Sequence, residues 1–138
     1  MPDAFILDAR LEKDAIYIAD LPLCQLRLNN DSRYPWFILI PRINNITEII
    51  DLSSAQQQQL WQESAALSHW LKANYQQAKL NIAALGNVVS QLHLHHIVRF
   101  ENDDAWPAPV WGKFLPNAYT RQTEVALKQH FLDTFSLF

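Results

Sequence analysis

The chain has 138 residues, of which 49% are apolar and 18% are charged, and its single cysteine is Cys24. This length suits one domain with its own hydrophobic core, so residues 1–138 are expected to form a single domain, and the composition excludes an intrinsically disordered chain. The formal charge of −3 provides no general attraction to nucleic acid or to anionic membranes. A single cysteine cannot form an internal disulfide, which gives no indication of an oxidising compartment.

The N-terminal residues do not resemble a secretory signal. Asp3 comes early, and no basic segment followed by an apolar run is present. No stretch reaches the roughly 20 apolar residues that a membrane-spanning helix requires. We therefore expect a cytoplasmic protein whose partners include neither a membrane nor nucleic acid.

The first half of the chain predicts three strands. Residues 15–20 are rich in β-branched and aromatic side chains, and residues 23–28 alternate between apolar and polar. Residues 36–40 form a continuous apolar run, which is typical of a buried central strand. A turn composition at 29–32 precedes this run, and Pro41 ends it.

The second half predicts a long helix followed by two more strands and a terminal helix. The helix begins at Ser53, whose spacing to Gln56 is that of a capping box, and it runs to about Tyr75. The remaining elements are expected over residues 79–85, 91–100 and 120–135. This order of elements predicts an α+β fold.

The residues whose side chains could take part in catalysis lie together in the predicted strand 91–100, in the run Gln-Leu-His-Leu-His-His-Ile-Val-Arg. Alternate residues of a strand share a face, so one face is expected to carry Gln91, His93, His95, Ile97 and Arg99. A neutral imidazole can attack phosphorus, and a second imidazole can orient the phosphate or protonate the leaving oxygen. An arginine can neutralise phosphate oxygens. This face therefore predicts a site for a phosphate ester.

Other readings of these histidines remain open. His96 points toward the core side of the strand, which favours a structural, hydrogen-bonded histidine, and Gln91 is either a surface residue or a member of the site. His69 and His130 lie in the predicted helices and are interpreted as ordinary histidines. A His-x-His pair also begins metal sites in cupin-type barrels, but those barrels are glycine-rich and this chain has only two glycines and a long central helix. Metal binding is therefore the less favoured alternative.

The segment 81–99 resembles the signature of the histidine triad (HIT) family. In that signature a glycine turn, here at Gly86, precedes a strand of the form His-φ-His-φ-His-φ-φ, where φ is apolar. Residues 36–42 resemble the family's strand that ends in Pro-Lys/Arg. The resemblance covers residues 23–99 and implies a HIT-like α+β fold, with about five antiparallel strands, one long helix and a C-terminal helix.

The resemblance also implies roles for individual residues. His93 matches the histidine that attacks the α-phosphorus in active members and forms a nucleotidyl-histidine, and His95 matches the histidine that contacts the phosphate and the leaving group. The residues that match or lie near the family's ligand contacts are Gly86 and Asn87 (phosphate turn), Asn29 or Asn30 (ribose), Asn81 (a further phosphate contact) and Arg99 (a phosphate or interface cation).

Two positions depart from the family pattern. Gln91 replaces the first histidine of the triad, and Trp36 stands where many members carry a further histidine. Glutamine can hydrogen-bond but cannot titrate near neutral pH, so we expect Gln91 to act as an orienting residue. The Trp- and Pro-rich segment 106–116 has no periodicity, and it is expected either to fold over the nucleotide or to pack in a dimer or core contact.

The expected reaction is hydrolysis or transfer at the α-phosphate of a nucleotide conjugate, such as a dinucleoside polyphosphate or a nucleoside phosphoramidate. No cofactor is expected to be required, although Mg²⁺ can accompany a polyphosphate. The family resemblance implies a homodimer. The alternative is a purine nucleotide-binding protein without turnover, because two of the family's histidines are absent; a His-ligated metal-binding protein is a further, less favoured one.

Overall fold

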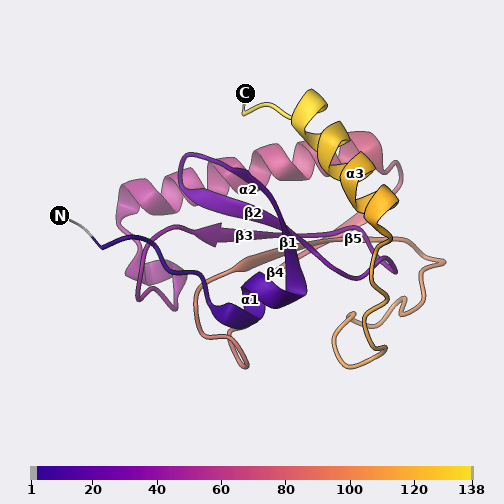
Figure 1. Ribbon diagram of the computed structural model, residues 1–138, viewed down its shortest axis with the longest axis horizontal. Helices are drawn as coiled ribbons and strands as arrows, with labels where there is room; N and C mark the ends of the chain where they lie inside the picture. Colours follow the sequence, from indigo (N-terminus) through magenta and orange to yellow (C-terminus); the bar gives the residue numbers. More distant parts are fainter. Residues whose placement is uncertain (1–2, 138) are drawn as a thin grey trace.

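The computed structural model describes residues 3–137, and its centre is a five-stranded antiparallel sheet (Figure 1). The strands are β1 (Ala15–Asp20), β2 (Cys24–Asn29), β3 (Trp36–Pro41), β4 (Lys79–Ala83) and β5 (Leu94–Arg99). Their order across the sheet is β1-β2-β3-β5-β4, so β2, β3 and β5 are internal. The helices are α1 (Ala9–Asp14), α2 (Ser54–Asn74) and α3 (Arg121–Thr134), with a short 3₁₀ turn, η1 (Ile49–Asp51), before α2.

The predicted fold class is confirmed. The sheet, the long helix and the C-terminal helix are all present, and α2 begins with the expected capping box. The Ser53 hydroxyl accepts from the backbone N–H of Gln56 at 3.2 Å, and the Gln56 side chain accepts from the N–H of Ser53 at 2.8 Å. The segment 5–10, whose periodicity predicts neither a strand nor a helix, leads into α1.

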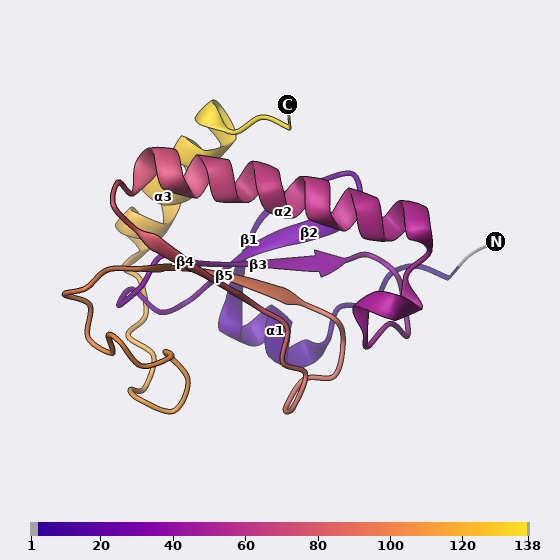
Figure 2. The same cartoon turned by 180° about the vertical axis from the view of Figure 1, so that it is seen from behind.

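The sheet separates two hydrophobic cores. On one face α2 and α3 pack against the strands, and this core includes Phe37, Leu67, Trp70 and Phe131. On the other face lie α1 and the long irregular segment 100–118, with Tyr34, Trp36 and Ile97 in the second core (Figures 1 and 2). Because both faces are covered, β3 is buried at every position, which explains its continuous apolar run.

The strand that carries the histidines is shorter than predicted. Leu39 of β3 pairs with Leu94, and β5 begins there rather than at Gln91. Two residues beyond Leu39, Pro41 has no N–H with which to continue the ladder. The backbone N–H of Leu92 donates instead to the carbonyl of Ile46 at 2.9 Å. Residues 91–93 therefore lead into β5 without being part of its regular ladder.

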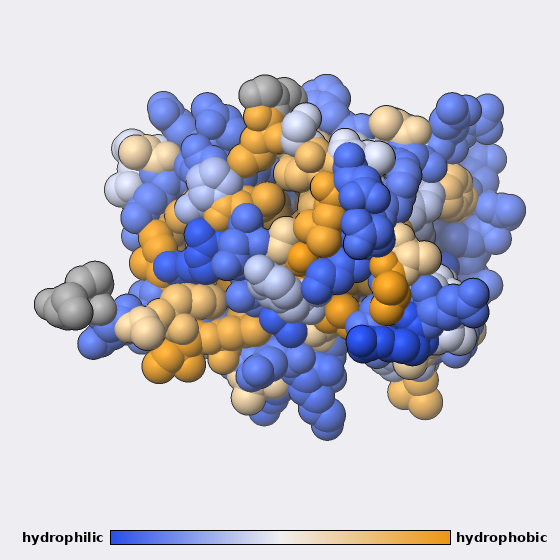
Figure 3. Space-filling model, turned by 45° about the horizontal axis from the view of Figure 1, so that its top comes forward, coloured by the Kyte–Doolittle hydropathy of each residue, from blue (hydrophilic) through white to orange (hydrophobic). Residues whose placement is uncertain are grey.

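The outer surface is mixed in polarity. In the view of Figure 3, polar residues separate several apolar patches. Large apolar side chains that remain about half exposed include Trp61 on α2 and Val125 and Leu132 on α3, at 50%, 50% and 49%. Over residues 3–137, no helix combines the length and the apolar character needed to cross a membrane.

Candidate active site

His93 and His95 lie side by side at the start of β5. Their ring centroids are 4.8 Å apart and their planes are inclined at 72°. His95 is paired in the sheet with Ile38 of β3 and Ala83 of β4, which fixes its backbone on both sides. Both rings are nearly buried, with 7% of His93 and 6% of His95 exposed.

The protonation of His93 follows from its hydrogen bond. Its Nδ1 lies 2.7 Å from the backbone carbonyl oxygen of Gln91. A carbonyl oxygen only accepts hydrogen bonds, so Nδ1 carries the proton and donates it. Neutral His93 therefore keeps its lone pair on Nε2, which is the form of imidazole that can attack an electrophile.

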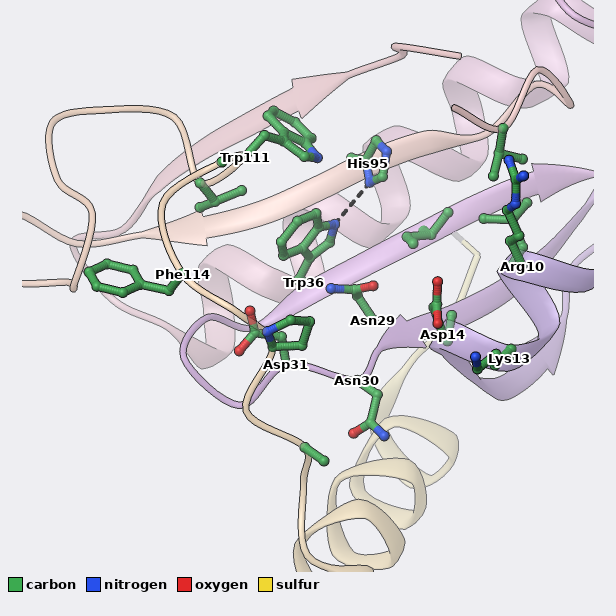
Figure 4. Close-up of a pocket in the computed structure, with 18 residues that line it drawn as sticks. Arg10, Lys13, Asp14, Asn29, Asn30, Asp31, Trp36, His95, Trp111 and Phe114 are labelled. Carbon is green, nitrogen blue, oxygen red and sulfur yellow. Dashed lines mark hydrogen bonds between the residues drawn. The ribbon is translucent and has the colours of Figure 1, made fainter. Parts of the chain in front are cut away.

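His95 has the opposite arrangement. The indole Nε1–H of Trp36 donates to His95 Nδ1 at 2.9 Å (Figure 4). An indole nitrogen only donates, so His95 Nδ1 is an acceptor and the proton of the neutral ring is on Nε2. Burial, assisted by the neighbouring His93 and His96, lowers the pKa of His95 to about 3. His95 is thus a neutral ring with one N–H to offer.

Next to His95 is a cavity of about 530 Å³. This volume is within the range of small-molecule binding sites. Its apolar wall includes Trp36, Ile38 and Trp111, and Trp111 contacts the edge of His95 with the ring centroids 5.2 Å apart. Its polar wall consists of Arg10, Lys13, Asp14, Asn29, Asn30 and Asp31 (Figure 4). An aromatic wall facing amide, carboxylate and cationic groups suits a ligand with a flat ring at one end and polar groups at the other.

His93 borders a second, much smaller hollow. This hollow of about 30 Å³ has room for roughly one water molecule and is also lined by Gly86, Ser90 and Gln91. Gly86 has a φ of +79°, a conformation that glycine adopts readily, and it shapes the turn before the histidines. Asn87 follows in the same turn with its side chain exposed. The histidine pair therefore lies between the large cavity and the phosphate turn that the resemblance implies.

A family model named HIT domain matches residues 10–102 of the chain. The chain belongs to the HIT family. Membership supports a nucleotide-related hydrolase or transferase function in general. No curated protein matches the chain.

Solved structures of bacterial histidine triad proteins superpose closely on this HIT domain. The protein of Bradyrhizobium japonicum is 42% identical, with a TM-score of 0.93 over 97% of this chain and 100% of that one. The protein of Sinorhizobium meliloti is 40% identical, with a TM-score of 0.92 over 95% and 97% of the two chains. The protein of Marinobacter aquaeolei is 44% identical, with a TM-score of 0.92 over 97% and 100%.

In this HIT domain the side chain of Gln91 points away from the imidazoles. Its Oε1 accepts from the backbone N–H of Asp8 at 2.8 Å, and its Nε2 donates to the carbonyl of Ile6 at 3.0 Å. A further bond joins the N-terminal residues to the turn before the histidines, because Arg10 donates from Nη1 to the carbonyl of Val88 at 2.9 Å. The expected orienting role thus belongs to the main-chain carbonyl of Gln91, while its amide holds residues 5–14, here called the N-terminal arm.

Arg99 and Asn81 require a correction. The Arg99 guanidinium donates to Asp103 from Nε and Nη2 at 2.8 and 3.1 Å, and from Nη1 to Asn81 Oδ1 at 2.9 Å. Only 2% of Arg99 is exposed, and its Nη2 also donates to the carbonyl of Ala108 at 2.8 Å. These bonds occupy the guanidinium that was expected to contact phosphate. Arg99 therefore holds the segment 100–118, Asn81 supports it through Oδ1, and neither residue lines the cavity.

His96 has the structural role that its position predicts. It is fully buried on the α2 side of the sheet. Its Nδ1 donates to the carbonyl of Leu94 at 3.1 Å, which leaves Nε2 to accept from the Ser64 hydroxyl at 2.7 Å. Burial lowers the pKa of His96 to about 4.

The Trp- and Pro-rich segment makes the expected core contact and also lines the cavity. Ala105 and Val110 join the second core, while Trp111, Gly112 and Phe114 line the cavity beside His95. The cavity residues that sequence reasoning missed include Trp111 and, on the N-terminal arm, Arg10, Lys13 and Asp14. The tryptophan content of 106–116 signalled an aromatic contact, whereas nothing in the arm's sequence marked it as a cavity wall.

Residues 3–137 contain no group of three or more His, Cys, Asp or Glu side chains arranged to hold a metal ion.

Proposed function

We propose that this HIT domain hydrolyses nucleotide conjugates at the α-phosphate through a nucleotidyl-His93 intermediate. The observation that carries the proposal is the complementary protonation of the two rings. His93 offers a lone pair on Nε2 because the Gln91 carbonyl holds its other nitrogen, and His95 offers an N–H on Nε2 because Trp36 occupies its other nitrogen. A nucleophile and a hydrogen-bond donor thus lie with ring centroids 4.8 Å apart.

The cavity has parts that suit a nucleotide. Its aromatic and aliphatic wall, with Trp36 and Ile38, suits a purine ring, and Asn29 can bind ribose hydroxyls. Asn30 Oδ1 already accepts from the backbone N–H of Tyr119, which leaves only its amide N–H groups for a ligand. The α-phosphate would then lie at the histidine pair, next to the turn of Gly86 and Asn87. Mg²⁺ can accompany a polyphosphate substrate as its counter-ion.

The proposal is tested by AMP release from a panel of AMP conjugates. We expect release by the unaltered protein and a loss of at least about 1,000-fold in His93→Ala, because removal of a nucleophile eliminates the covalent route. His69→Ala, which changes a histidine on α2 outside the site, is the matched control and should retain the rate. A His93→Ala rate equal to that of the unaltered protein would contradict the covalent route.

The alternative is a nucleotide-binding protein without turnover, and the same experiment identifies it. AMP would then bind tightly, by calorimetry, while no conjugate is cleaved. The absence of a titratable side chain at Gln91 is the observation in favour of this reading. The homodimer and the cytoplasmic location implied by the sequence stay predictions.

A further inference from the structure

The hydrogen bond between Trp36 and His95 limits what His95 can do. To become an imidazolium, His95 would need a proton on Nδ1 as well as on Nε2. That proton would face the indole N–H of Trp36 across a distance of 2.9 Å, so two donors would meet without an acceptor between them. Trp36 is only 8% exposed and makes edge contacts with Tyr34 and Trp111, so its ring is fixed in place. The indole therefore holds His95 in its neutral form.

The surroundings of His95 act in the same direction. His93, just before β5, and His96, within β5, are its neighbours along the chain, and Trp36 and Trp111 contact its ring from β3 and the segment 100–118. Charged groups that line the adjoining cavity are the cations Arg10 and Lys13 and the carboxylates Asp14 and Asp31. Within residues 3–137, the hydrogen bonds of His95 include none to a carboxylate that would stabilise a positive ring. Burial lowers its pKa well below neutrality.

A neutral imidazole N–H can donate a hydrogen bond to a leaving group but is far too weak an acid to protonate one. An amine or an alkoxide must gain a proton to depart from phosphorus, whereas a phosphate or carboxylate departs as a stable anion. We propose that the substrates are nucleotidyl anhydrides, in which a phosphate or carboxylate oxygen is bonded to the α-phosphorus, and that phosphoramidates and alkyl esters are poor substrates. This inference rests on the proposed function and selects among its substrates.

The step balances without an acid. The lone pair of His93 Nε2 forms a bond to the α-phosphorus, and the bond from phosphorus to the bridging oxygen breaks with its electron pair remaining on that oxygen. The anion leaves with a hydrogen bond from His95 Nε2–H, and the His93 ring bears a positive charge with Nδ1–H on the Gln91 carbonyl. Water then attacks the phosphorus, and the P–N pair returns to Nε2. One water proton stays on the product phosphate and the other passes to solvent.

The first test is a comparison of leaving groups on one nucleotide. We expect kcat/KM for AMP release from a diadenosine polyphosphate to exceed that from an adenosine phosphoramidate by at least about 100-fold. In a series of AMP aryl esters, kcat/KM should fall steadily as the pKa of the leaving phenol rises. Phosphoramidate cleavage as fast as anhydride cleavage would overturn the inference and leave the proposed function standing. If AMP were released from no conjugate, both the inference and the proposed function would be contradicted.

The second test addresses Trp36 itself. Trp36→Phe keeps an aromatic ring but removes the N–H, so His95 Nδ1 becomes free to take a proton. The ratio of phosphoramidate to anhydride kcat/KM should then rise at least tenfold below pH 6. Trp111→Phe is the matched control, because Trp111 contacts the same ring edge-on without a hydrogen bond, and its ratio should not change.

Nitrogen-15 NMR gives a readout that is independent of turnover. In the unaltered protein the shifts of His95 should report an unprotonated Nδ1 and a protonated Nε2, and they should not change between pH 7 and pH 5. In Trp36→Phe the same ring should change its protonation over that interval. A protonated Nδ1 in the unaltered protein would contradict the role of Trp36 directly.

Discussion

The three histidines at positions 93, 95 and 96 differ in chemical state because each ring has different hydrogen-bond partners. A carbonyl oxygen holds a proton on Nδ1 of His93, and an indole N–H excludes one from Nδ1 of His95. The Ser64 hydroxyl and the Leu94 carbonyl satisfy both nitrogens of His96. Position relative to fixed donors and acceptors, rather than residue type, thus decides which ring can react and which one stabilises the core.

The buried histidines predict a dependence of stability on pH. The pKa of His96 is about 4 in the folded chain, against roughly 6.5 for an unperturbed histidine. As pH falls below about 6.5 the unfolded chain takes up a proton that the folded chain does not, so the free energy of unfolding should decrease until about pH 4, by an amount on the order of 3 kcal/mol for this residue. His95 acts in the same direction down to about pH 3.

Urea unfolding at pH 7 and pH 4.5 measures this effect. His96→Gln should show a smaller loss of stability between the two pH values than the unaltered protein, because glutamine does not titrate. Gln58→Ala, which changes a non-titrating, exposed residue of α2, serves as the control and should keep the full loss. Equal losses in all three proteins would contradict the assignment to His96.

The sequence predicted which histidines share a face of the sheet better than it predicted the partners of their side chains. The alternation from 91 to 96 correctly separated His93 and His95, which lie together, from His96, which lies on the α2 side. The turn of the Gln91 side chain toward Ile6 and Asp8 could not be predicted, because these contacts join residues 85 and 83 positions apart. The ion pair between Arg99 and Asp103 could not be predicted for a related reason, since it depends on how the irregular segment after β5 folds back.

Among the elements, the N-terminal arm is held by hydrogen bonds from the side chains of Gln91 and Asn44 as well as by the packing of its apolar residues in the second core. Its helix α1 has six residues and buries only Leu11. The amide of Gln91 supplies both a donor and an acceptor to the arm's backbone, and the arm in turn forms one wall of the cavity. The element's position therefore depends on a residue that adjoins the reactive histidines.

Removal of this amide should loosen the arm. In Gln91→Ala we expect the backbone N–H of Asp8 to exchange with deuterium at least tenfold faster, because its acceptor is gone. KM for AMP conjugates should rise several-fold, with a smaller change in kcat, since the arm lines the cavity and the Gln91 carbonyl that orients His93 remains. Gln129→Ala on α3 is the control. An unchanged exchange rate at the Asp8 N–H would contradict the role of the Gln91 amide in holding the N-terminal arm.

Element boundaries were predictable where the local pattern was decisive. The capping box placed the start of α2, and Pro41 placed the end of β3. The start of β5 was predicted three residues too early, because the sequence shows an alternating pattern through 91–93 while the pairing with β3 stops at Leu39 and Leu94. Strand length depends on the neighbour as well as on the strand itself.

At the scale of the whole molecule, a buried ion pair fastens the segment 100–118 to the sheet. The Arg99–Asp103 ion pair there is buried, with 2% and 6% of the two side chains exposed. Asp103 also accepts from the backbone N–H groups of Phe100, Ala105 and Trp106. These bonds and Arg99 hold the pKa of Asp103 below its usual value, against the effect of burial.

Substitution at this point should destabilise the fold. Asp103→Ala leaves a buried guanidinium without its partner, and we expect a loss of about 3–5 kcal/mol in the free energy of unfolding. Asp104→Ala is a matched control, because Asp104 pairs with Arg33 at an exposed site and should cost less than about 1 kcal/mol. Chemical denaturation measures both. Similar small losses would show that the segment is held by its apolar contacts alone.

The sheet thus keeps His93 and His95 at a rigid surface that is covered on both faces, while helix α1 and the segment 100–118 supply the outer walls of the neighbouring cavity. Insertions or exchanges in those outer segments would alter ligand preference without disturbing the strand register. Related proteins with the same central sheet can therefore diverge in the molecules they recognise while sharing one chemistry, and grafting of residues 100–118 between relatives is a direct route to new selectivity.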